Sequence, residues 1–363
     1  MSIEKWKLVA INLLVFFVLF NILYWSVPTL NYLLTVSRAS GVTDDPRARL
    51  PNYANVTWAP QHYREFNQTK IDYKSFIDWR HSPFHGETIN VGGPYAQRLT
   101  INQGTAKSKE AYFFGGSTMW GIGVRDDATI PSQFAAATGI WSENFGEVAY
   151  TAHQSLILLV QLLQDGHRPD IVVFYDGVND VSDKCRAELT PYSHAREAAF
   201  DGLFKNARDK FSFHVYFAGL RAFATWVRYE IDRRVAPAEA GRSYDCDSNP
   251  EKATKIAQNL LADWKMAEQL VASYGGRFVG ILQPVVYFSQ TRQDHLRDDP
   301  ALRNLRAEFQ AVYPLVERVM TEDDALYNMV SALDVDDYIY VDISHLSPNG
   351  NALIAARMAE IIK

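Results

Sequence analysis

The sequence predicts an α/β fold built on a mostly parallel central sheet. From Lys107 onward, short apolar runs alternate with amphipathic stretches, which is the pattern of successive βαβ units. Residues 171–175 form a continuous apolar run, as expected of a central parallel strand buried on both faces. Four predicted strands end in glycine or polar residues, and in an open α/β sheet the carboxyl ends of the strands form the ligand crevice.

The composition is that of an ordinary folded protein. The chain has 363 residues, of which 47% are hydrophobic and 21% are charged. A formal net charge of -6 without a long basic run argues against a nucleic-acid partner. The two cysteines, Cys185 and Cys246, lack the spacing of a zinc site, and we expect neither a metal nor a cofactor.

The N-terminus predicts a membrane anchor. Residues 8–27 are almost wholly apolar, and at about 1.5 Å per residue they can span a hydrocarbon core of roughly 30 Å. A cleaved signal peptide and a buried core helix are the alternatives, but no small-residue cleavage site follows the run. Lysines before the run favour a cytoplasmic segment 1–7 with the rest of the chain outside the plasma or inner membrane. In that oxidising compartment Cys185 and Cys246 can form a disulfide.

Residues 28–106 predict a linker and a juxtamembrane extension. Residues 37–61 are rich in Pro, Asn, Asp and Arg, which is typical of a surface linker. The aromatic residues of segment 63–100 indicate a small packed extension, in which residues 88–91 suggest an edge strand. His81 and His85 are four apart, but Pro83 lies between them and disfavours a metal-binding helix, so we interpret both as packing or surface residues.

The elements of the domain 107–363 follow from its periodicity. Compact apolar runs predict strands, and amphipathic stretches such as the one with Leu156, Leu159, Val160 and Leu163 on one face predict helices. The predicted strands are 111–114, 141–145, 171–175, 277–283 and 338–341. The predicted helices are 130–137, 154–164, 251–274, 302–320 and 324–333. Ser347 and Pro348 open a last helix as N-cap and first residue.

An irregular insertion, residues 181–250, interrupts this alternation. It contains both cysteines and an aromatic, basic stretch, 211–234, that we expect to be helical. Aromatic residues of the extension and the insertion, among them Trp79, Tyr216 and Trp226, suit a sugar groove but are more typical of a core.

The strand ends carry the residues that acyl transfer requires. Gly115-Gly116-Ser117 ends the first strand and holds a hydroxyl where following N–H groups can face a developing negative charge. Asp342 and His345, three apart, can meet through a local turn, and the ring can then face the serine. Gly146 ends the second strand, and Gly177-Val178-Asn179-Asp180 ends the third. Each has a structural alternative, as a turn residue, a cap or a surface carboxylate. Asp176 and Asp180 together are more typical of solvated caps than of a metal site.

Taken in order, these blocks resemble the SGNH (GDSL-type) hydrolase superfamily over residues 107–363. The resemblance implies a three-layer α/β/α sandwich of flavodoxin-like type. It assigns the nucleophile to Ser117, the base to His345 and its orienting carboxylate to Asp342. It also implies an oxyanion hole formed by the N–H groups of Ser117 and Gly146 and the amide of Asn179. Gly116 stands where the family has an aspartate, and Gly115, Gly177 and Asp180 support the motifs.

The resemblance implies a serine esterase that works through an acyl-serine intermediate. Membrane-anchored chains of this kind are associated with acylation or deacylation of cell-envelope polysaccharide, so we expect an O-acetyl ester on a glycan, or a small ester, as substrate, and other envelope polysaccharide-biosynthesis proteins as partners. One alternative is an O-acyltransferase that uses the same triad. Another is a non-catalytic, membrane-anchored glycan-binding or assembly factor.

Overall fold

The structure, a computed structural model, describes residues 4–20, 22, 45–102, 106–209 and 243–362. The chain divides into two compact units, which are Met1–Thr43 with Arg196–Gly241, and Asp44–Ala195 with Arg242–Lys363. The second unit contains the sheet and all the candidate site residues.

An eight-stranded sheet forms the centre of the second unit, in the order β10-β9-β8-β6-β7-β5-β4-β3. The strands from β10 to β7 are parallel, and β5, β4 and β3 continue the sheet as antiparallel neighbours. The predicted mostly parallel sheet is confirmed. The bounds are β3 Phe84–His85, β4 Asn90–Gly92, β5 Gln97–Arg98, β6 Ala106–Gly115, β7 Ile140–Asn144, β8 Ile171–Asp176, β9 Arg277–Leu282 and β10 Leu326–Asn328.

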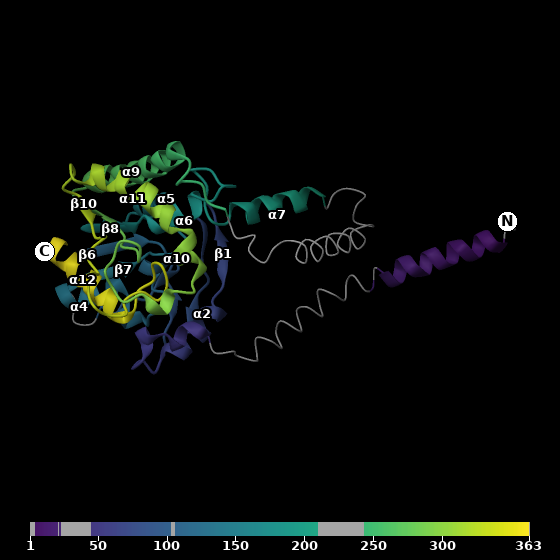
Figure 1. Ribbon diagram of the computed structural model, residues 1–363, viewed down its shortest axis with the longest axis horizontal. Coiled ribbons are helices and arrows are strands. Elements are labelled where there is room, and N and C mark those ends of the chain that lie inside the picture. The colour runs from purple at the N-terminus through teal and green to yellow at the C-terminus, as the bar shows by residue number, and fades with distance from the viewer. Residues whose placement is uncertain (1–3, 21, 23–44, 103–105, 210–242, 363) are drawn as a thin grey trace. The chain divides into compact units, whose positions relative to one another are not determined.

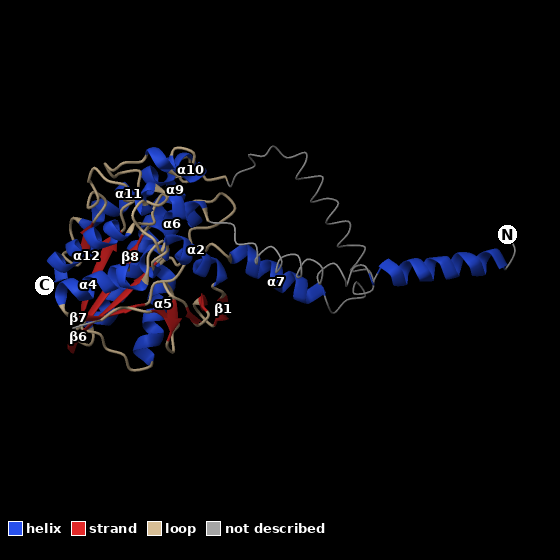
Figure 2. Cartoon of the chain, turned by 90° about the horizontal axis from the view of Figure 1, so that it is seen from below, coloured by secondary structure: helices blue, strands red, loops and turns tan. Residues whose placement is uncertain are grey.

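The sheet lies between two groups of helices (Figures 1 and 2). Right-handed crossovers place α4, which joins β6 to β7, on one face, and α5, α9 and α11 on the other. Helix α12 packs against α4, and α9 packs against α5 and α11. The main helices are α4 Ile130–Thr138, α5 Ala152–Gln164, α9 Pro250–Ala272, α11 Arg306–Met320 and α12 Pro348–Ile362.

The strongest apolar run forms the centre of the core. Every residue of β8 is buried, and β8 pairs with β6 on one side and β9 on the other. Phe113, Phe114, Phe174 and Phe278 are all buried, and the rings of Phe114 and Phe174 lie 5.1 Å apart. These contacts fix the two strands whose carboxyl ends carry Ser117 and Asn179.

The compact unit that contains the sheet begins at Asp44, whereas the predicted domain boundary is at residue 107. Residues 45–102 belong to the same compact unit as the sheet, to which they contribute β3, β4 and β5. The segment also contains helix α2 (Ala59–Gln68) and a separate antiparallel hairpin of β1 (Ile71–Lys74) and β2 (Asp78–His81). The strand predicted at 88–91 is β4, which lies inside the sheet and not at its edge. The extension is therefore part of the fold.

Three other predictions differ from the structure. The helix predicted at 302–320 is divided into α10 (Pro300–Asn304) and α11. The helix predicted at 324–333 contains the short strand β10, which pairs with β9. Residues 338–341 form no strand of the sheet, and only an isolated bridge joins Tyr340 to Leu346. Tyr340 and Val341 are buried by packing instead, and Val341 lies against Tyr53 and Tyr63 of the extension.

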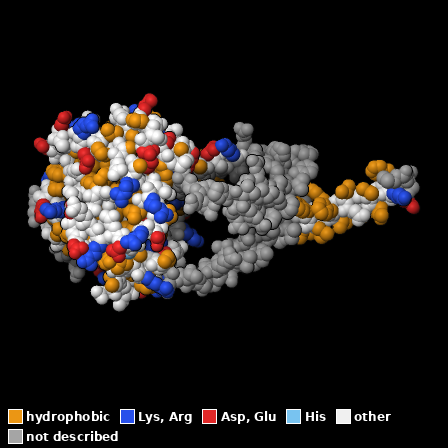
Figure 3. Space-filling view, viewed as in Figure 1, with side chains coloured by type: hydrophobic (Ala, Val, Ile, Leu, Met, Phe, Trp, Pro, Cys, Tyr) orange, Lys and Arg blue, Asp and Glu red, His pale blue; other side chains and the backbone are white. Residues whose placement is uncertain are grey.

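Two segments in the described part of the first unit are helical. Residues 4–20 are helical, and most of their side chains are exposed apolar groups, coloured orange in Figure 3. Within the described residues, no helix is both long enough and apolar enough to span a membrane. The predicted span 8–27 includes residues 21 and 23–27, which lie outside the described part of the chain, as does the helix predicted at 211–234, with Tyr216 and Trp226. Helix α7 (Glu197–Asp209) exposes Leu203 and Phe204.

Candidate active site

Ser117 begins a short helix directly after strand β6. Gly115 at the strand end has a φ of 150°, and a β-carbon there would lie 2.4 Å from the carbonyl oxygen of Tyr175 on the neighbouring strand. Only glycine permits the two strands to stay this close while the chain turns. Helix α3 (Ser117–Trp120) then ends at Gly121, whose φ is 101°. The Ser117 hydroxyl is thereby held at the carboxyl edge of the sheet.

Ser117, His345 and Asp342 are joined in that order by hydrogen bonds. His345 Nε2 lies 2.7 Å from Ser117 Oγ, and His345 Nδ1 lies 2.5 Å from Asp342 Oδ2. Asp342 Oδ1 also accepts the backbone N–H groups of Ser344 and His345, at 2.9 and 2.8 Å. Burial by itself would raise the pKa of Asp342, but the charge and hydrogen bonds of His345 hold that pKa well below its ordinary value. The carboxylate therefore stays ionised and orients the imidazole.

The loop that carries Asp342 and His345 is fixed from two sides. Its own turn is closed by the N–H of Val341, which donates to the carbonyl of His345 at 2.8 Å. On the side of the extension, the Asn52 amide donates to the carbonyls of Tyr338 and Tyr340, at 2.8 and 3.0 Å. The position of the imidazole thus depends on residues from both ends of the second unit.

Asn179 points its amide toward the turn before Ser117. It lies in the first turn of α6 (Val178–Lys184), which begins at Gly177 with a φ of 114°. Asn179 Nδ2 donates to the carbonyl of Tyr150 at 2.7 Å. It also lies 2.3 Å from the point that a β-carbon on Gly116 would occupy. The amide has a second N–H, so it can donate to an oxyanion formed at Ser117.

The structure does not direct the Gly146 N–H toward Ser117, which corrects its predicted role. This N–H donates to Asn144 Oδ1 at 3.0 Å. A β-carbon on Gly146 would lie 2.6 Å from the backbone nitrogen of Trp120. Gly146 therefore permits the loop after β7 to pack closely against helix α3. The oxyanion donors that remain from the prediction are the N–H of Ser117 and the amide of Asn179.

Asp180 and Asp176 have structural partners beneath the site. Asp180 Oδ1 accepts from Lys184 Nζ at 2.6 Å, and both side chains are buried. Asp176 Oδ2 accepts from Trp264 Nε1 at 3.0 Å, and burial followed by the nearby charge of Asp180 raises the pKa of Asp176 well above its ordinary value. Both carboxylates are therefore buried parts of the framework, and the expectation that they are solvated caps is wrong.

One group of potential metal ligands occurs among the described residues, and it lies outside this site. It consists of Cys185, Cys246 and Glu308. The two cysteines are joined in a disulfide, so their sulfur atoms are already bonded to each other.

Sequence reasoning missed two residues that connect the serine helix to the histidine loop. Gln283 Nε2 donates to Thr118 Oγ1 at 2.8 Å, and Thr118 Oγ1 donates to the carbonyl of Ser344 at 3.2 Å. Gln283 directly follows strand β9. Its place at a strand end is the signal that could have identified it.

No protein-family model matches this chain, and no curated protein matches it. Solved structures with a similar fold include a member of the lipolytic G-D-S-L family from Veillonella parvula. It is 11% identical with a TM-score of 0.40, and the match covers 70% of this chain and 97% of that one. A GDSL-like lipase from Bacteroides thetaiotaomicron is 14% identical with a TM-score of 0.39, covering 72% and 95%. An acetyl xylan esterase is 14% identical with a TM-score of 0.37, covering 70% and 100%. Two of these three structures, those from Veillonella parvula and Bacteroides thetaiotaomicron, carry the G-D-S-L name.

Proposed function

We propose that this protein is a serine hydrolase that cleaves esters through an acyl-serine intermediate. The observation that supports this best is the continuous hydrogen-bonded series from Ser117 Oγ through the His345 ring to Asp342 Oδ2. A hydroxyl, an imidazole and an ionised carboxylate in this order are the parts that convert a weak nucleophile into a reactive one.

The proposed reaction has two steps. His345 Nε2 takes the proton of Ser117 while Oγ attacks the ester carbonyl, and the N–H of Ser117 and the Asn179 amide stabilise the oxyanion. The alcohol leaves with the proton from His345, and an acyl-serine remains. Water then attacks the acyl group, again with His345 as base, which releases the acid and restores the serine.

The serine is tested with a small chromogenic ester such as p-nitrophenyl acetate. Ser117→Ala should abolish turnover and labelling by a fluorophosphonate probe without lowering the thermal midpoint. Ser273→Ala is a matched control, because Ser273 is exposed and bonds only a carbonyl of its own helix end. Undiminished hydrolysis by Ser117→Ala would refute the assignment. A non-catalytic glycan-binding factor would show no labelling of the unaltered protein.

The finer proposal is that the substrate is an O-acetyl ester on a cell-envelope or extracellular polysaccharide and that residues 8–27 anchor the protein in the membrane. The apolar sequence and the exposed apolar side chains of residues 4–20 support the anchor, because such a surface is stable in lipid and costly in water. The disulfide supports an extracytoplasmic site for the α/β unit, since disulfides persist in oxidising compartments.

Two measurements test the finer proposal. Full-length protein should stay in the membrane fraction after carbonate washing and be released by detergent, and release by carbonate alone would contradict the anchor. Incubation with an acetylated polysaccharide should release free acetate in a Ser117-dependent manner. Acetate that appears on an added acceptor glycan instead of in solution would identify an O-acyltransferase.

A further inference from the structure

Strand β2 carries no residue of the triad. Its residues form hydrogen bonds with residues 145–151, the loop that joins β7 to α5. Trp79 Nε1 donates to the carbonyl of Val148 at 2.9 Å. In the opposite direction, Tyr150 Oη donates to the carbonyl of Ile77, directly before β2, at 2.8 Å, and it also contacts the carbonyl of Trp79 within β2. Trp79 and Tyr150 are both fully buried, so water does not compete for these contacts.

Arg80 holds the start of the same loop. Its guanidinium is 1% exposed, and Nη1 donates to the carbonyls of Phe145 and Gly146, at 2.9 and 3.2 Å. A charged side chain is rarely buried to this degree unless its donors are satisfied, and here backbone carbonyls satisfy them. The loop backbone is thereby fixed at the point where it passes under helix α3.

His81 is bonded to the only loop residue that carries a charge, Glu147. Glu147 is fully buried and accepts the His81 N–H at 2.8 Å and His81 Nδ1 at 2.5 Å. Burial by itself would raise the pKa of Glu147, but the hydrogen bonds and charge of His81, and then the charge of Arg80, hold that pKa below its ordinary value. The ionised Glu147 carboxylate thus binds the loop to strand β2.

The loop that these contacts hold is strained. Ala149 has a φ of 62°, in the left-handed region that non-glycine residues rarely adopt. Such a conformation is strained and persists only where the surroundings impose it. The bonds from Trp79 to Val148 and from Tyr150 to Ile77 lie on either side of Ala149 and impose it here.

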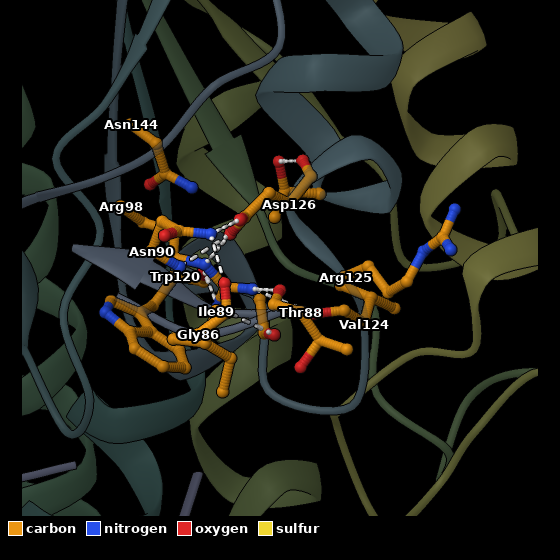
Figure 4. A network of polar contacts seen from close by, with 12 residues as sticks. Gly86, Thr88, Ile89, Asn90, Arg98, Trp120, Val124, Arg125, Asp126 and Asn144 are labelled. Atoms are coloured by element: carbon orange, nitrogen blue, oxygen red, sulfur yellow. Dashed lines mark hydrogen bonds and ion pairs between the residues drawn. The ribbon is translucent and has the colours of Figure 1, made fainter. Parts of the chain in front are cut away.

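The ring of His81 also contacts the serine helix. It stacks on Trp120, the last residue of α3, with ring centroids 4.5 Å apart and planes 23° from parallel. The guanidinium of Arg98 lies 4.5 Å from the centroid of the Trp120 ring. Arg98 is itself held by Asp126 and by the carbonyls of Thr88 and Val124, as Figure 4 shows. The indole of Trp120 therefore has charged or polar groups of the extension as close neighbours.

The same loop contacts the proposed oxyanion site through Tyr150. The hydroxyl of Tyr150 is bonded to the backbone at the start of β2. The carbonyl of Tyr150 accepts a hydrogen bond from Asn179 Nδ2 at 2.7 Å. The Asn179 amide is in turn close to Gly116, directly before Ser117. A continuous series of contacts therefore leads from β2 to both proposed oxyanion donors.

We propose that His81, through its bond to Glu147 and its contact with Trp120, is a positioning residue for the acyl-transfer site. It holds the β7–α5 loop in place, and the loop in turn holds the Asn179 amide beside Ser117. The inference rests on the proposed function. It makes the extension, and not only the domain 107–363, a determinant of turnover.

The test compares three variants with the unaltered full-length protein. His81→Ala removes the bond to Glu147 and the contact with Trp120. His81→Asn keeps a side-chain nitrogen near the place of Nδ1 and can restore the bond. His85→Ala is the matched control, because His85 is an exposed histidine on β3, the next strand in the sequence. For each protein, kcat and KM for p-nitrophenyl acetate, the rate of fluorophosphonate labelling and the thermal midpoint are measured.

We expect His81→Ala to lower kcat and the labelling rate by about 10- to 100-fold with little change in KM, because misplaced oxyanion donors act on the transition state. His81→Asn should recover most of this loss, and His85→Ala should match the unaltered protein. If His81→Ala does not fold, Glu147→Gln, which keeps the shape and removes the charge, should show the same loss.

Two results would overturn the inference. One is an equal labelling rate for His81→Ala and the unaltered protein. The other is a loss of kcat in His81→Ala no greater than its loss of folded protein, which would make the histidine purely structural. A failure of the proposed function looks different, since the unaltered protein would then show no labelling at all.

Discussion

A β-carbon on Gly116 would lie 2.3 Å from Asn179 Nδ2. This distance is far shorter than any normal contact, so the Asn179 amide occupies the space that a side chain at position 116 would need. The φ of Gly116 is -79°, which every residue tolerates, so the constraint is one of space and not of backbone strain.

Gly116→Ala should therefore impair chemistry more than folding. The added methyl group displaces the Asn179 amide, and loss of one oxyanion donor typically lowers kcat by about 10²- to 10³-fold. The measurement is kcat for a short-chain aryl ester alongside the thermal midpoint. Gly92→Ala is the control, because a β-carbon there meets nothing within 4 Å. Equal kcat values for both variants would contradict the assigned role of Asn179.

Asp342→Asn should lower kcat by about 10⁴-fold while leaving the protein folded. The amide keeps the size of the carboxylate, but it can donate to His345 Nδ1 and so favour the wrong tautomer of the ring. It also cannot stabilise the imidazolium that forms during attack. Steady-state hydrolysis at pH 7 to 8 checks this, and a loss of less than about tenfold would mean that Asp342 does not orient His345.

Glu65 should make the stability of the protein depend on pH in the acidic range. Burial would raise its pKa, but hydrogen bonds from Thr88, Gln61 and the N–H of Glu87 lower the pKa from 4.5 to about 2. A lowered pKa stabilises the folded state above pH 4.5, and that stabilisation is lost as the pH falls toward 2. It amounts to at most about 3 kcal/mol.

The measurement for Glu65 is urea unfolding between pH 2.5 and 6. The unaltered protein should lose stability more steeply than Glu65→Gln over this interval, because the glutamine does not titrate. Parallel curves would show that Glu65 titrates as in the unfolded chain. Glu360→Gln is the control, since Glu360 is an exposed carboxylate on α12.

Reduction of the Cys185–Cys246 disulfide should destabilise the second unit without abolishing activity. The bond closes a loop between residues 61 apart in sequence, and such a constraint on the unfolded chain is worth about 2–4 kcal/mol. The double variant Cys185→Ser, Cys246→Ser should unfold at lower urea concentration than the oxidised protein and should no longer respond to dithiothreitol. A response to dithiothreitol that survives the double substitution would exclude the disulfide as its cause.

The sequence predicted those parts of the fold that depend on local patterns. The apolar run of β8 and the Ser347-Pro348 helix start were correct because burial on two faces and helix capping leave clear local signals. Residues 338–341 looked like a strand because they are apolar. Instead Val341 packs with Tyr53 and Tyr63 of the extension, whereas Tyr340 bonds Ser289 and Tyr338 lies against His295. Strand β10 has three residues and no apolar run, and it depends on its neighbour β9.

The predictions of the site residues were limited in the same way, because they too rested on local patterns. Asp342 and His345 are three apart, and the sequence predicted their contact. Asn144 and Gly146 are two apart, yet their bond was not predicted, because it depends on the path of the loop after β7. The contacts of Arg80, His81 and Arg98 join segments far apart in the chain. The sequence singled out neither Arg80 nor Arg98, because burial of a charge by distant carbonyls leaves no periodic signal.

The pairing of β5 with β7 has a practical consequence for anyone who prepares the protein without its N-terminus. A version cut at residue 107 would leave the outer backbone groups of β7 without hydrogen-bond partners, and exposed strand edges of this kind join to one another and drive aggregation. A version that starts near Asp45 retains the strands that cover this edge. Solubility of a shortened protein should therefore improve when more of the chain is kept.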